Sequence, residues 1–367
     1  MSTLKVDSIV DGGGSGAPTA PNGLTVGTTA IPTSGALSNR NLIINGAMQV
    51  AQRGTSVTVG SGTYLCDRFF CTKTGTAALT YEQSSDAPDG FNKSAKITVD
   101  TAQALQASDY TQFTTHIEGY DISHLGLGTP QAKQITLSFW VKSSLTGSFG
   151  LALANGAVDK NYVTSYSISS ASTWEYKTIT LTGAVDGTWV TNNTRAFSIY
   201  WDLGIGPTYS TSTQDTWITA FNFGLNGAVK LKETAGATFQ ITGVQLELGD
   251  TATPFEHRSY GDELAKCQRY YYRWGFSDAY FSSGTIPFQG YADSVAGIDI
   301  WQNYNVEMRA RPSITVSGTW SSSNVSSFYG RFQNRQGFSI RYEPISTGSC
   351  YVYANSADDY FEHDAEL

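Results

Sequence analysis

GVQLELGDTATPFEHRSYGDELAKCQRYYYRW, residues 243 to 274, separates two long runs of strand-like sequence and decides how the chain is divided. Within the strand that leads into it, residues 238–249, side chains at alternating positions should face the same side. The apolar positions nevertheless change parity, because Phe239 and Ile241 are followed by Val244, Leu246 and Leu248. One extra residue accounts for this change, so a β-bulge is predicted at the glycine, Gly243.

A single helix is predicted over residues 259–273. Ser259, with Asp262 three residues later, resembles a capping box. Large side chains then recur at helical spacing, at Tyr260, Leu264, Cys267, Tyr271 and Trp274. At about 1.5 Å per residue this helix would be about 20 Å long, enough to link two β domains. Its stripe of Tyr260, Leu264, Cys267 and Tyr271 either forms the seam of a homotrimer or docks on the chain's own sandwich.

The composition is typical of an all-β protein. The chain has 367 residues with 37 glycines and 13% aromatic residues, which favours sheets over helix bundles. Only 15% of the residues are charged, against about a quarter in ordinary soluble domains. Much of the surface is therefore predicted to be polar but uncharged, which suits contacts with sugars or with other subunits.

Charge and cysteine usage argue against several classes of protein. The net charge is −8 and the basic residues do not cluster, so nucleic-acid binding is not expected. The sequence has no window of about 18 apolar residues, so no membrane insertion is expected. The four cysteines are too sparse for a disulfide framework, and folding in a reducing cytoplasm is predicted.

Residues 1–40 are predicted to form an extended arm. LKVDSIV places Leu4, Val6, Ile9 and Val10 in a short strand-like pattern, and the following DGGGSGAPTAPNG is rich in glycine and proline. Such a segment cannot build a core by itself. It is either a disordered tail or an arm that becomes ordered against another subunit or a larger assembly, and its apolar positions favour the arm.

Residues 41–258 are predicted to form an antiparallel jelly-roll sandwich, because roughly ten short strands follow one another with turn signals between them. In QITLSFWVK the inward set is Ile135, Leu137, Phe139 and Val141, and in RAFSIYWDL it is Phe197, Ile199, Trp201 and Leu203. Trp140 and Tyr200 then lie opposite the core faces. There they either stack on a sugar or pack against a neighbouring subunit.

Motifs for catalysis are absent from the sequence, which has no P-loop, no HExxH and no dinucleotide-binding glycine pattern. We therefore predict no enzyme, no catalytic residue and no cofactor. The histidines lie far apart without metal-ligand spacing, and surface or capping roles are expected for His116, His124, His257 and His363. An acidic run is expected to be a solvated end, and it comprises Asp358, Asp359, Glu362, Asp364 and Glu366.

Several long motifs, in the same order, resemble a family of phage tail fibres. They include NLIINGAMQVAQRGTS, SSDAPDGF, ITLSFWVKSS, STWEYKTITLTG and TFQITGVQLELGDTATPFEHRSYGDELAKCQRYYYR. The resemblance covers most of residues 41–273. It implies a jelly roll similar to carbohydrate-binding modules, with the linking helix leading to a small C-terminal β-sandwich over residues 274–367.

The same resemblance implies a place and partners for the protein. It implies a structural protein of the virion tail that is assembled in the host cytoplasm, forms homotrimers and binds host surface glycans for adsorption. The arm of residues 1–40 would attach to other tail proteins through Leu4, Val6, Ile9 and Val10. Two other classes stay open: a purely structural connector or decoration protein, and a polysaccharide-degrading tailspike.

If the arm anchors the chain, the C-terminal sandwich is distal and its aromatic side chains are candidates for stacking on sugars. The candidates are Trp274, Tyr280, Trp301, Tyr304, Trp320 and Tyr329. Most of these rings are equally expected to be core or subunit interface, as aromatic residues usually are. A structural Ca²⁺, which jelly rolls similar to carbohydrate-binding modules often hold, would take its oxygens from Asp86, Asp89, Glu247 or Asp250. Turn and capping roles explain the same four residues.

Overall fold

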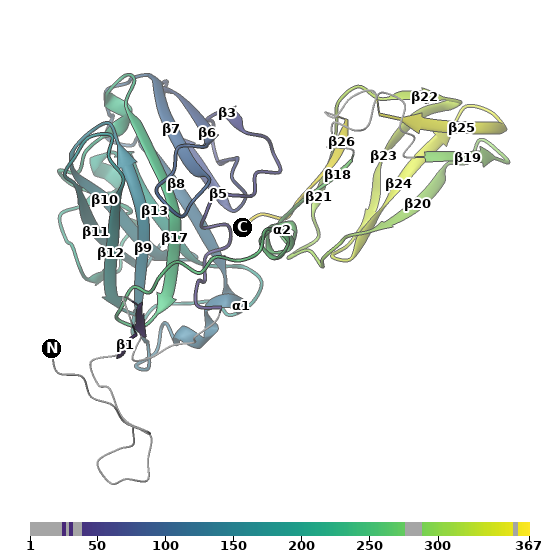
Figure 1. The fold of residues 1–367 in the computed structure, drawn as a ribbon. Coiled ribbons are helices and arrows are strands. Elements are labelled where there is room, and N and C mark those ends of the chain that lie inside the picture. The colour runs from purple at the N-terminus through teal and green to yellow at the C-terminus, as the bar shows by residue number, and fades with distance from the viewer. Residues whose placement is uncertain (1–23, 27–28, 32–38, 276–287, 355–358) are drawn as a thin grey trace, which may run out of the picture.

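The computed structural model describes residues 24–26, 29–31, 39–275, 288–354 and 359–367. Leu4, Val6, Ile9, Val10, Tyr280 and Asp358, which the sequence singled out, lie outside these residues. The described chain forms a large β-sheet body and a smaller one, with the short helix α2 between them (Figure 1). The all-β prediction is confirmed. Among the described helices, none has the length and apolar character needed to cross a bilayer.

The larger body is a jelly-roll sandwich of two antiparallel sheets. The seven-stranded sheet has the order β15-β11-β10-β13-β8-β5-β4, which is Trp217–Ile218, Asn161–Ile168, Gly147–Asn155, Arg195–Ile205, Tyr110–Glu118, Phe69–Lys73 and Thr63–Tyr64. The six-stranded sheet has the order β12-β9-β17-β7-β6-β3, which is Glu175–Thr182, Gln134–Ser143, Thr238–Leu248, Ser94–Thr101, Ala78–Ser84 and Ser56–Thr58.

Four smaller strands, a short α-helix and three 3-10 helices also belong to this described part of the chain, and the 3-10 helices span Ser123–Leu125, Pro207–Tyr209 and Leu231–Glu233. Strands β1 (Leu24–Val26) and β2 (Thr29–Ile31) form a hairpin. Strands β14 (Ser210–Thr211) and β16 (Gly224–Leu225) pair in parallel, and helix α1 spans Gly119–Ile122.

The core of the sandwich lies between the two sheets and follows the alternation of the strands. On β9 the buried set is Ile135, Leu137, Phe139 and Val141, and on β13 it is Phe197, Ile199, Trp201 and Leu203. Both sets agree with the prediction from period-2 spacing. Burial of large apolar side chains on both inner faces supplies most of the stability of such a fold, at about 25 cal/mol per Å² of apolar surface.

The predicted bulge in β17 is confirmed. The pairing of β17 with β9 shifts between Thr242 and Gln245, and Gly243 has the left-handed backbone angle φ +62°. Because the strand gains a residue there, Ile241 and Val244 both point into the core. Glycine adopts a positive φ at little cost, which explains the residue type.

The predicted helix is present but shorter than expected. Helix α2 spans Tyr260–Gln268, and the hydroxyl of Ser259 accepts a hydrogen bond from the Asp262 amide at 3.2 Å. The prediction that it continues to residue 273 is wrong, because β18 (Tyr271–Gly275) pairs with β26 (Tyr360–Asp364). Aromatic residues favour strands, and the backbone of the YYYRW run finds its hydrogen-bond partners in that sheet.

The described residues of the smaller body form three three-stranded sheets. Their orders are β18-β26-β21, β19-β25-β22 and β20-β24-β23. The strands not yet given are β19 Phe288–Ala292, β20 Ile298–Asn303, β21 Ser313–Ser317, β22 Ser321–Ser323, β23 Val325–Gln333, β24 Gly337–Pro344 and β25 Gly348–Tyr353. Its core is rich in aromatic rings, including Tyr272, Tyr304, Phe338, Tyr342 and Phe361.

The acidic run is not a solvated end, so that prediction is wrong. Strand β26 is the central strand of its sheet, and Asp359 and His363 are fully buried. The sequence alternates in this strand, with Phe361 and His363 buried and Glu362 and Asp364 only partly buried. An acidic composition hid a period-2 pattern that a strand requires.

Glu366 connects the two bodies. It forms ion pairs with Arg68, which is 2% exposed, and with Arg53, and both arginines belong to the jelly roll. Nearby, the Arg269 guanidinium donates to Glu118 at 2.6 Å. Arg309 donates to the carbonyl oxygens of Asn193 and Ala365 at 2.8 and 2.7 Å. The junction is therefore a network of buried and half-buried charges rather than a bare linker.

Candidate functional site

A groove opens on the outer face of the six-stranded sheet, where Trp140 of β9 lies opposite Tyr176 of β12 in the strand register. The two rings are 5.3 Å apart at a tilt of 49°, and Tyr176 is 44% exposed. The groove has a volume of about 560 Å³. We call it the aromatic groove, and it is lined by Asp89, Gly90, Phe91, Ser138, Trp140, Tyr176, Gly243, Ala252, Thr253, Pro254, Phe255 and His257.

The bulge at Gly243 shapes the floor of the aromatic groove. A Cβ atom at this position would lie 2.7 Å from the ring of Phe91 and 3.1 Å from that of Trp140. The absence of a side chain therefore lets these two rings approach the backbone of β17 closely. The bulge that changes which residues of β17 face the core therefore also leaves space for Phe91 and Trp140 on the outer face.

The opposite wall of the aromatic groove is built from rings of two loops. Phe91 lies 5.0 Å from Phe255 and 5.2 Å from His257, and Phe255 lies 4.9 Å from His257. Phe91 follows strand β6, whereas Phe255 and His257 follow β17. Buried Glu247 holds this second loop, because its carboxylate accepts hydrogen bonds from the amide of Thr253 at 2.8 Å and from its hydroxyl at 2.6 Å.

Polar groups surround these rings. Asp89, Ser138 and His257 line the aromatic groove, and Asp86 contacts Lys142 of β9 and Trp174, the residue before β12. The Asp86 carboxylate accepts from the Lys142 ammonium at 2.5 Å and from the indole N–H of Trp174 at 3.1 Å. The hydrogen bond from Lys142 lowers the pKa of Asp86 below its usual range, so this carboxylate is ionised at neutral pH. Rings with donors and acceptors at their edges are suited to a ligand with one apolar face and polar edges.

The four calcium candidates do not converge. Asp86 is engaged by Lys142 and Trp174, Glu247 is buried against Thr253, and Asp250 accepts from the Thr251 hydroxyl. Asp89 alone lines the aromatic groove. Within the described part of the chain, no group of three or more His, Cys, Asp or Glu side chains is arranged to hold a metal ion.

The prediction that all four histidines are surface or capping residues is wrong for two of them. His116 and His363 are 5% and 0% exposed. The Nδ1 of His363 is 2.9 Å from the hydroxyl of Tyr304, and burial lowers the pKa of His363 to about 3. Burial also lowers the pKa of His116, and the charges of Arg195 and Arg68 add to that shift. His124 and His257 are exposed, as expected.

The C-terminal aromatic candidates divide into core and surface. Trp274, Tyr304 and Trp320 pack in or against the core, with Phe338 or Phe361 as neighbours. Only Trp301 and Tyr329 among the described candidates are exposed, at 46% and 42%.

Trp301 and Tyr329 flank a charged network on the outer face of the β20-β24-β23 sheet. Asp299 accepts from Arg341 at 2.6 Å and from Arg331 at 3.0 Å, and Glu343 accepts from the Tyr329 hydroxyl at 3.2 Å. The indole of Trp301 lies over Gly337, where a Cβ would be 2.7 Å away. This face is a second candidate surface.

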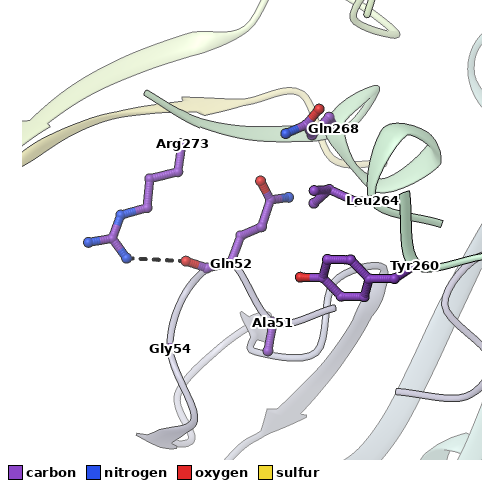
Figure 2. Close-up of a pocket in the computed structure, with 7 residues that line it drawn as sticks. All are labelled: Ala51, Gln52, Gly54, Tyr260, Leu264, Gln268 and Arg273. Carbon is purple, nitrogen blue, oxygen red and sulfur yellow. Dashed lines mark hydrogen bonds between the residues drawn. The ribbon is translucent and has the colours of Figure 1, made fainter. Parts of the chain in front are cut away.

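The four predicted seam residues, three on α2 and Tyr271 on β18, are split between a surface hollow and the interior. Tyr260 and Leu264 line a hollow of about 350 Å³ between α2 and residues 51–54 (Figure 2). There an Arg273 guanidinium donates to the Gln52 carbonyl oxygen at 3.3 Å. Cys267 and Tyr271 are buried inside their own chain and cannot belong to a seam on the surface of this chain. The homotrimer itself stays a prediction.

Sequence reasoning found Trp140 but not the rest of the aromatic groove. Tyr176 needed the register of β12 on β9, and Phe91, Phe255 and His257 needed the loop positions. Tyr200 does lie opposite the core face, but it is 4% exposed because the chain after β13 covers it with Phe223 and Leu225. The alternation of residues within one strand does not show whether a later segment of the chain covers its outer face.

Comparisons with known proteins give structural likeness only. No family model matches the chain, and no curated protein matches it. Among solved structures, the enzymatically active domain of tailspike protein 4 from bacteriophage CBA120 is 12% identical, with a TM-score of 0.30. The match covers 57% of this chain but only 21% of the tailspike chain.

Two carbohydrate-binding modules show the same level of likeness. The CBM22-1 xylan-binding domain of Xyn10C from Paenibacillus barcinonensis is 10% identical over 60% of this chain and 98% of its own, with a TM-score of 0.27. The family 11 module from Clostridium thermocellum, in complex with a mixed-linked tetrasaccharide, is 11% identical over 55% and 98%, also with a TM-score of 0.27. Likeness at this level assigns the chain to no family, and the jelly roll is defined by its own strand order.

Proposed function

We propose that this chain is a non-enzymatic glycan-binding protein and that the aromatic groove holds a short run of sugar units. The main support for this proposal is the pair of rings of Trp140 and Tyr176, which solvent can reach. The polar residues beside this pair are Ser138, Asp89 and His257. Sugar rings have apolar faces that pack on aromatic planes, and their hydroxyls need donors and acceptors at the edges. The volume of about 560 Å³ suits a ligand of that size.

The absence of catalysis is part of the proposal. Hydrolysis of a glycosidic bond needs two carboxyl groups about 5 to 10 Å apart. Asp89 is the only carboxylate among the residues that line the aromatic groove, and Asp86 is already held by Lys142 and Trp174. This arrangement supports binding without bond cleavage. Release of reducing sugar ends from a bound polysaccharide would instead favour the tailspike alternative.

The wider role that we propose is that of a phage tail fibre that adsorbs to host surface glycans. Its support is the ordered series of sequence motifs over residues 41–273. In this role residues 1–40 attach the chain to other tail proteins, the chain is a homotrimer, and the face bearing Trp301 and Tyr329 offers a second contact to the cell. The main alternative is a connector without a ligand, and the burial of most C-terminal aromatic candidates favours it.

A glycan array that presents host capsule and lipopolysaccharide oligosaccharides tests the proposal. We expect the intact chain to bind a subset of these glycans, and Trp140→Ala and Tyr176→Ala to weaken that binding at least about tenfold, or about 1.4 kcal/mol. Tyr120→Ala is the matched control, since Tyr120 is 57% exposed on α1 and is not among the residues that line the aromatic groove.

Two outcomes would count against the proposal. Absence of binding to every glycan would favour the connector, and equal binding by Tyr176→Ala and the unmodified chain would remove the aromatic groove from the site. Trp301→Ala then measures the second surface separately, because Trp301 belongs to the smaller body.

A further inference from the structure

A second pocket lies on the opposite sheet of the jelly roll. Its volume is about 360 Å³. We call it the Arg195 pocket, and it is lined by Tyr110, Gln112, Ala157, Val158, Arg195, Tyr200, Tyr209, Phe221 and Phe223. It shares no residue with the aromatic groove.

Five aromatic side chains form the walls of the Arg195 pocket. The rings of Tyr209 and Phe223 stack at 5.4 Å and 17°, and Phe221 meets both edge-on at 5.9 and 5.5 Å. Tyr110 meets Tyr209 edge-on at 5.8 Å. Phe223 is only 5% exposed whereas Phe221 is 56% exposed, so the walls are fixed by packing and the pocket has an exposed rim.

The polar groups of the Arg195 pocket have unused hydrogen-bonding capacity. Gln112 is 7% exposed, and its buried Oε1 has no hydrogen-bond partner among the described residues. Such an atom costs free energy unless a partner is supplied. Gln112 belongs to β8 and lines the pocket together with these rings.

Arg195 brings a positive charge that has no ion-pair partner within 4 Å among the described residues. Its Nε and Nη2 both donate to the carbonyl oxygen of Gly156, and no carboxylate of the described residues lies within ion-pair distance of its guanidinium. None of the residues that line the pocket is acidic. The lining therefore carries one positive charge, and the planar guanidinium retains N–H groups that match a carboxylate.

We propose that the Arg195 pocket binds an acidic sugar unit. The sugar ring packs among Tyr209, Phe221 and Phe223, its carboxylate meets the Arg195 guanidinium, and the Gln112 amide takes a hydroxyl. A neutral sugar leaves the charge of Arg195 without a counter-ion, and a cationic ligand is repelled by it. This site is separate from the aromatic groove, and its proposed ligand does not depend on binding there, because the two sites lie on different sheets.

Titration of the intact chain with sodium D-glucuronate, followed by ligand-observed NMR, tests this site, with D-glucose as the neutral match. We expect D-glucose to bind at least about tenfold more weakly. Gln112→Glu has the same shape but adds a negative charge, and it should weaken glucuronate binding by a similar factor. Phe221→Ala removes a ring that is mostly exposed, so the fold should be retained and glucuronate binding should fall severalfold.

Melting temperatures confirm that each variant is folded. Tyr176→Ala should leave glucuronate binding unchanged while it weakens the binding of neutral glycans on the array at least about tenfold. Gln112→Glu should weaken glucuronate binding and leave the binding of neutral glycans on the array unchanged. The two sites can therefore fail separately. Equal affinities for glucuronate and glucose, no binding of glucuronate, or unchanged binding by both Gln112→Glu and Phe221→Ala would overturn the proposal.

Discussion

The two β-sheet bodies fill their cores with different proportions of aromatic side chains. In the jelly roll, aliphatic residues fill much of the core, and rings such as Trp140 and Tyr176 are left for the outer face. In the smaller body, rings fill the core, and Trp301 and Tyr329 are the described candidates that remain exposed. Rings thus pack the core of both bodies, but they make up a larger share of the core in the smaller one.

Size explains the difference. A small body has a high ratio of surface to volume and few positions that can be fully buried. Each aromatic ring buries 150–250 Å², so a few rings make a sufficient core where many aliphatic side chains do not fit. The larger sandwich buries enough apolar surface without its outer rings.

The largest expected effect separates the two faces of the smaller body. Phe338→Ala should lower the free energy of unfolding by about 3–5 kcal/mol, because Phe338 is fully buried against Tyr304 and Phe361. Trp301→Ala, on the neighbouring strand but the opposite face, should cost less than about 1 kcal/mol. Chemical denaturation measures both. Similar losses in the free energy of unfolding for the two variants would contradict the distinction between core and surface rings.

The next effect concerns the junction. Glu366→Gln should cost about 3 kcal/mol, because it leaves Arg68 buried without its ionised partner. We also expect the two bodies to melt in separate steps in calorimetry. Glu343→Gln is the control, since Glu343 pairs with Arg341 at the surface and the substitution should leave the melting curve unchanged. A single unshifted transition for Glu366→Gln would show that the bodies are joined by other contacts.

A pH dependence follows from His363. Burial lowers its pKa to about 3 in the folded chain, against about 6.5 when unfolded, so its contribution is complete above pH 6.5 and is lost as the pH falls. Between pH 7 and pH 5 the loss should be about 2 kcal/mol. His363→Phe keeps a ring against Phe338 and should remove this dependence.

The difference between His363→Phe and the unmodified chain is the quantity to measure. Asp67 changes stability in the opposite direction, because burial raises its pKa to about 6 and its contribution is lost as the pH rises from about 4 to about 6. Taking the difference cancels Asp67. Identical pH profiles for the two chains would assign the histidine no role.

The smallest expected effect concerns the bulge at Gly243 in the jelly roll. Gly243→Ala and Gly236→Ala both place a side chain at a positive φ, of +62° and +75°, which costs about 1–2 kcal/mol in each case. Only at Gly243 does the new Cβ meet Phe91 and Trp140. We expect about 1 kcal/mol of additional destabilisation there, with loss of glycan binding in Gly243→Ala alone. If Gly243→Ala and Gly236→Ala had the same stability and bound glycans equally well, the bulge would have no role in the binding site.

Local periodicity in the sequence predicted much of the fold. The parity change around Gly243, the inward sets of β9 and β13, and the Ser259 cap all follow from the order of residues in one element. The end of α2 did not, because the strand partner of Tyr271 is Asp364, which lies far along the chain. Strand β26 was missed for another reason, because its acidic composition concealed the alternation of buried and partly buried residues.

The candidate site was less accessible to such reasoning. Trp140 stood out because it interrupts a polar face, but the position of Tyr176 depends on strand register and that of Phe255 on a loop. The Arg195 pocket was missed because the segment that covers Tyr200 follows β13 without any pattern that fixes where it lies. Long-range pairing and loop placement are tertiary facts that no short window of sequence contains.

The chain enters the smaller body through β18 and leaves it through β26, and these neighbouring antiparallel strands have Tyr271 and Asp364 side by side at the jelly-roll end. The smaller body is thus connected to the jelly roll at two points, by α2 before β18 and by Glu366 after β26. A pulling force applied at its far tip would be shared between two tethers. For a protein that we propose links a particle to a cell, such a doubled attachment resists mechanical detachment better than a single hinge.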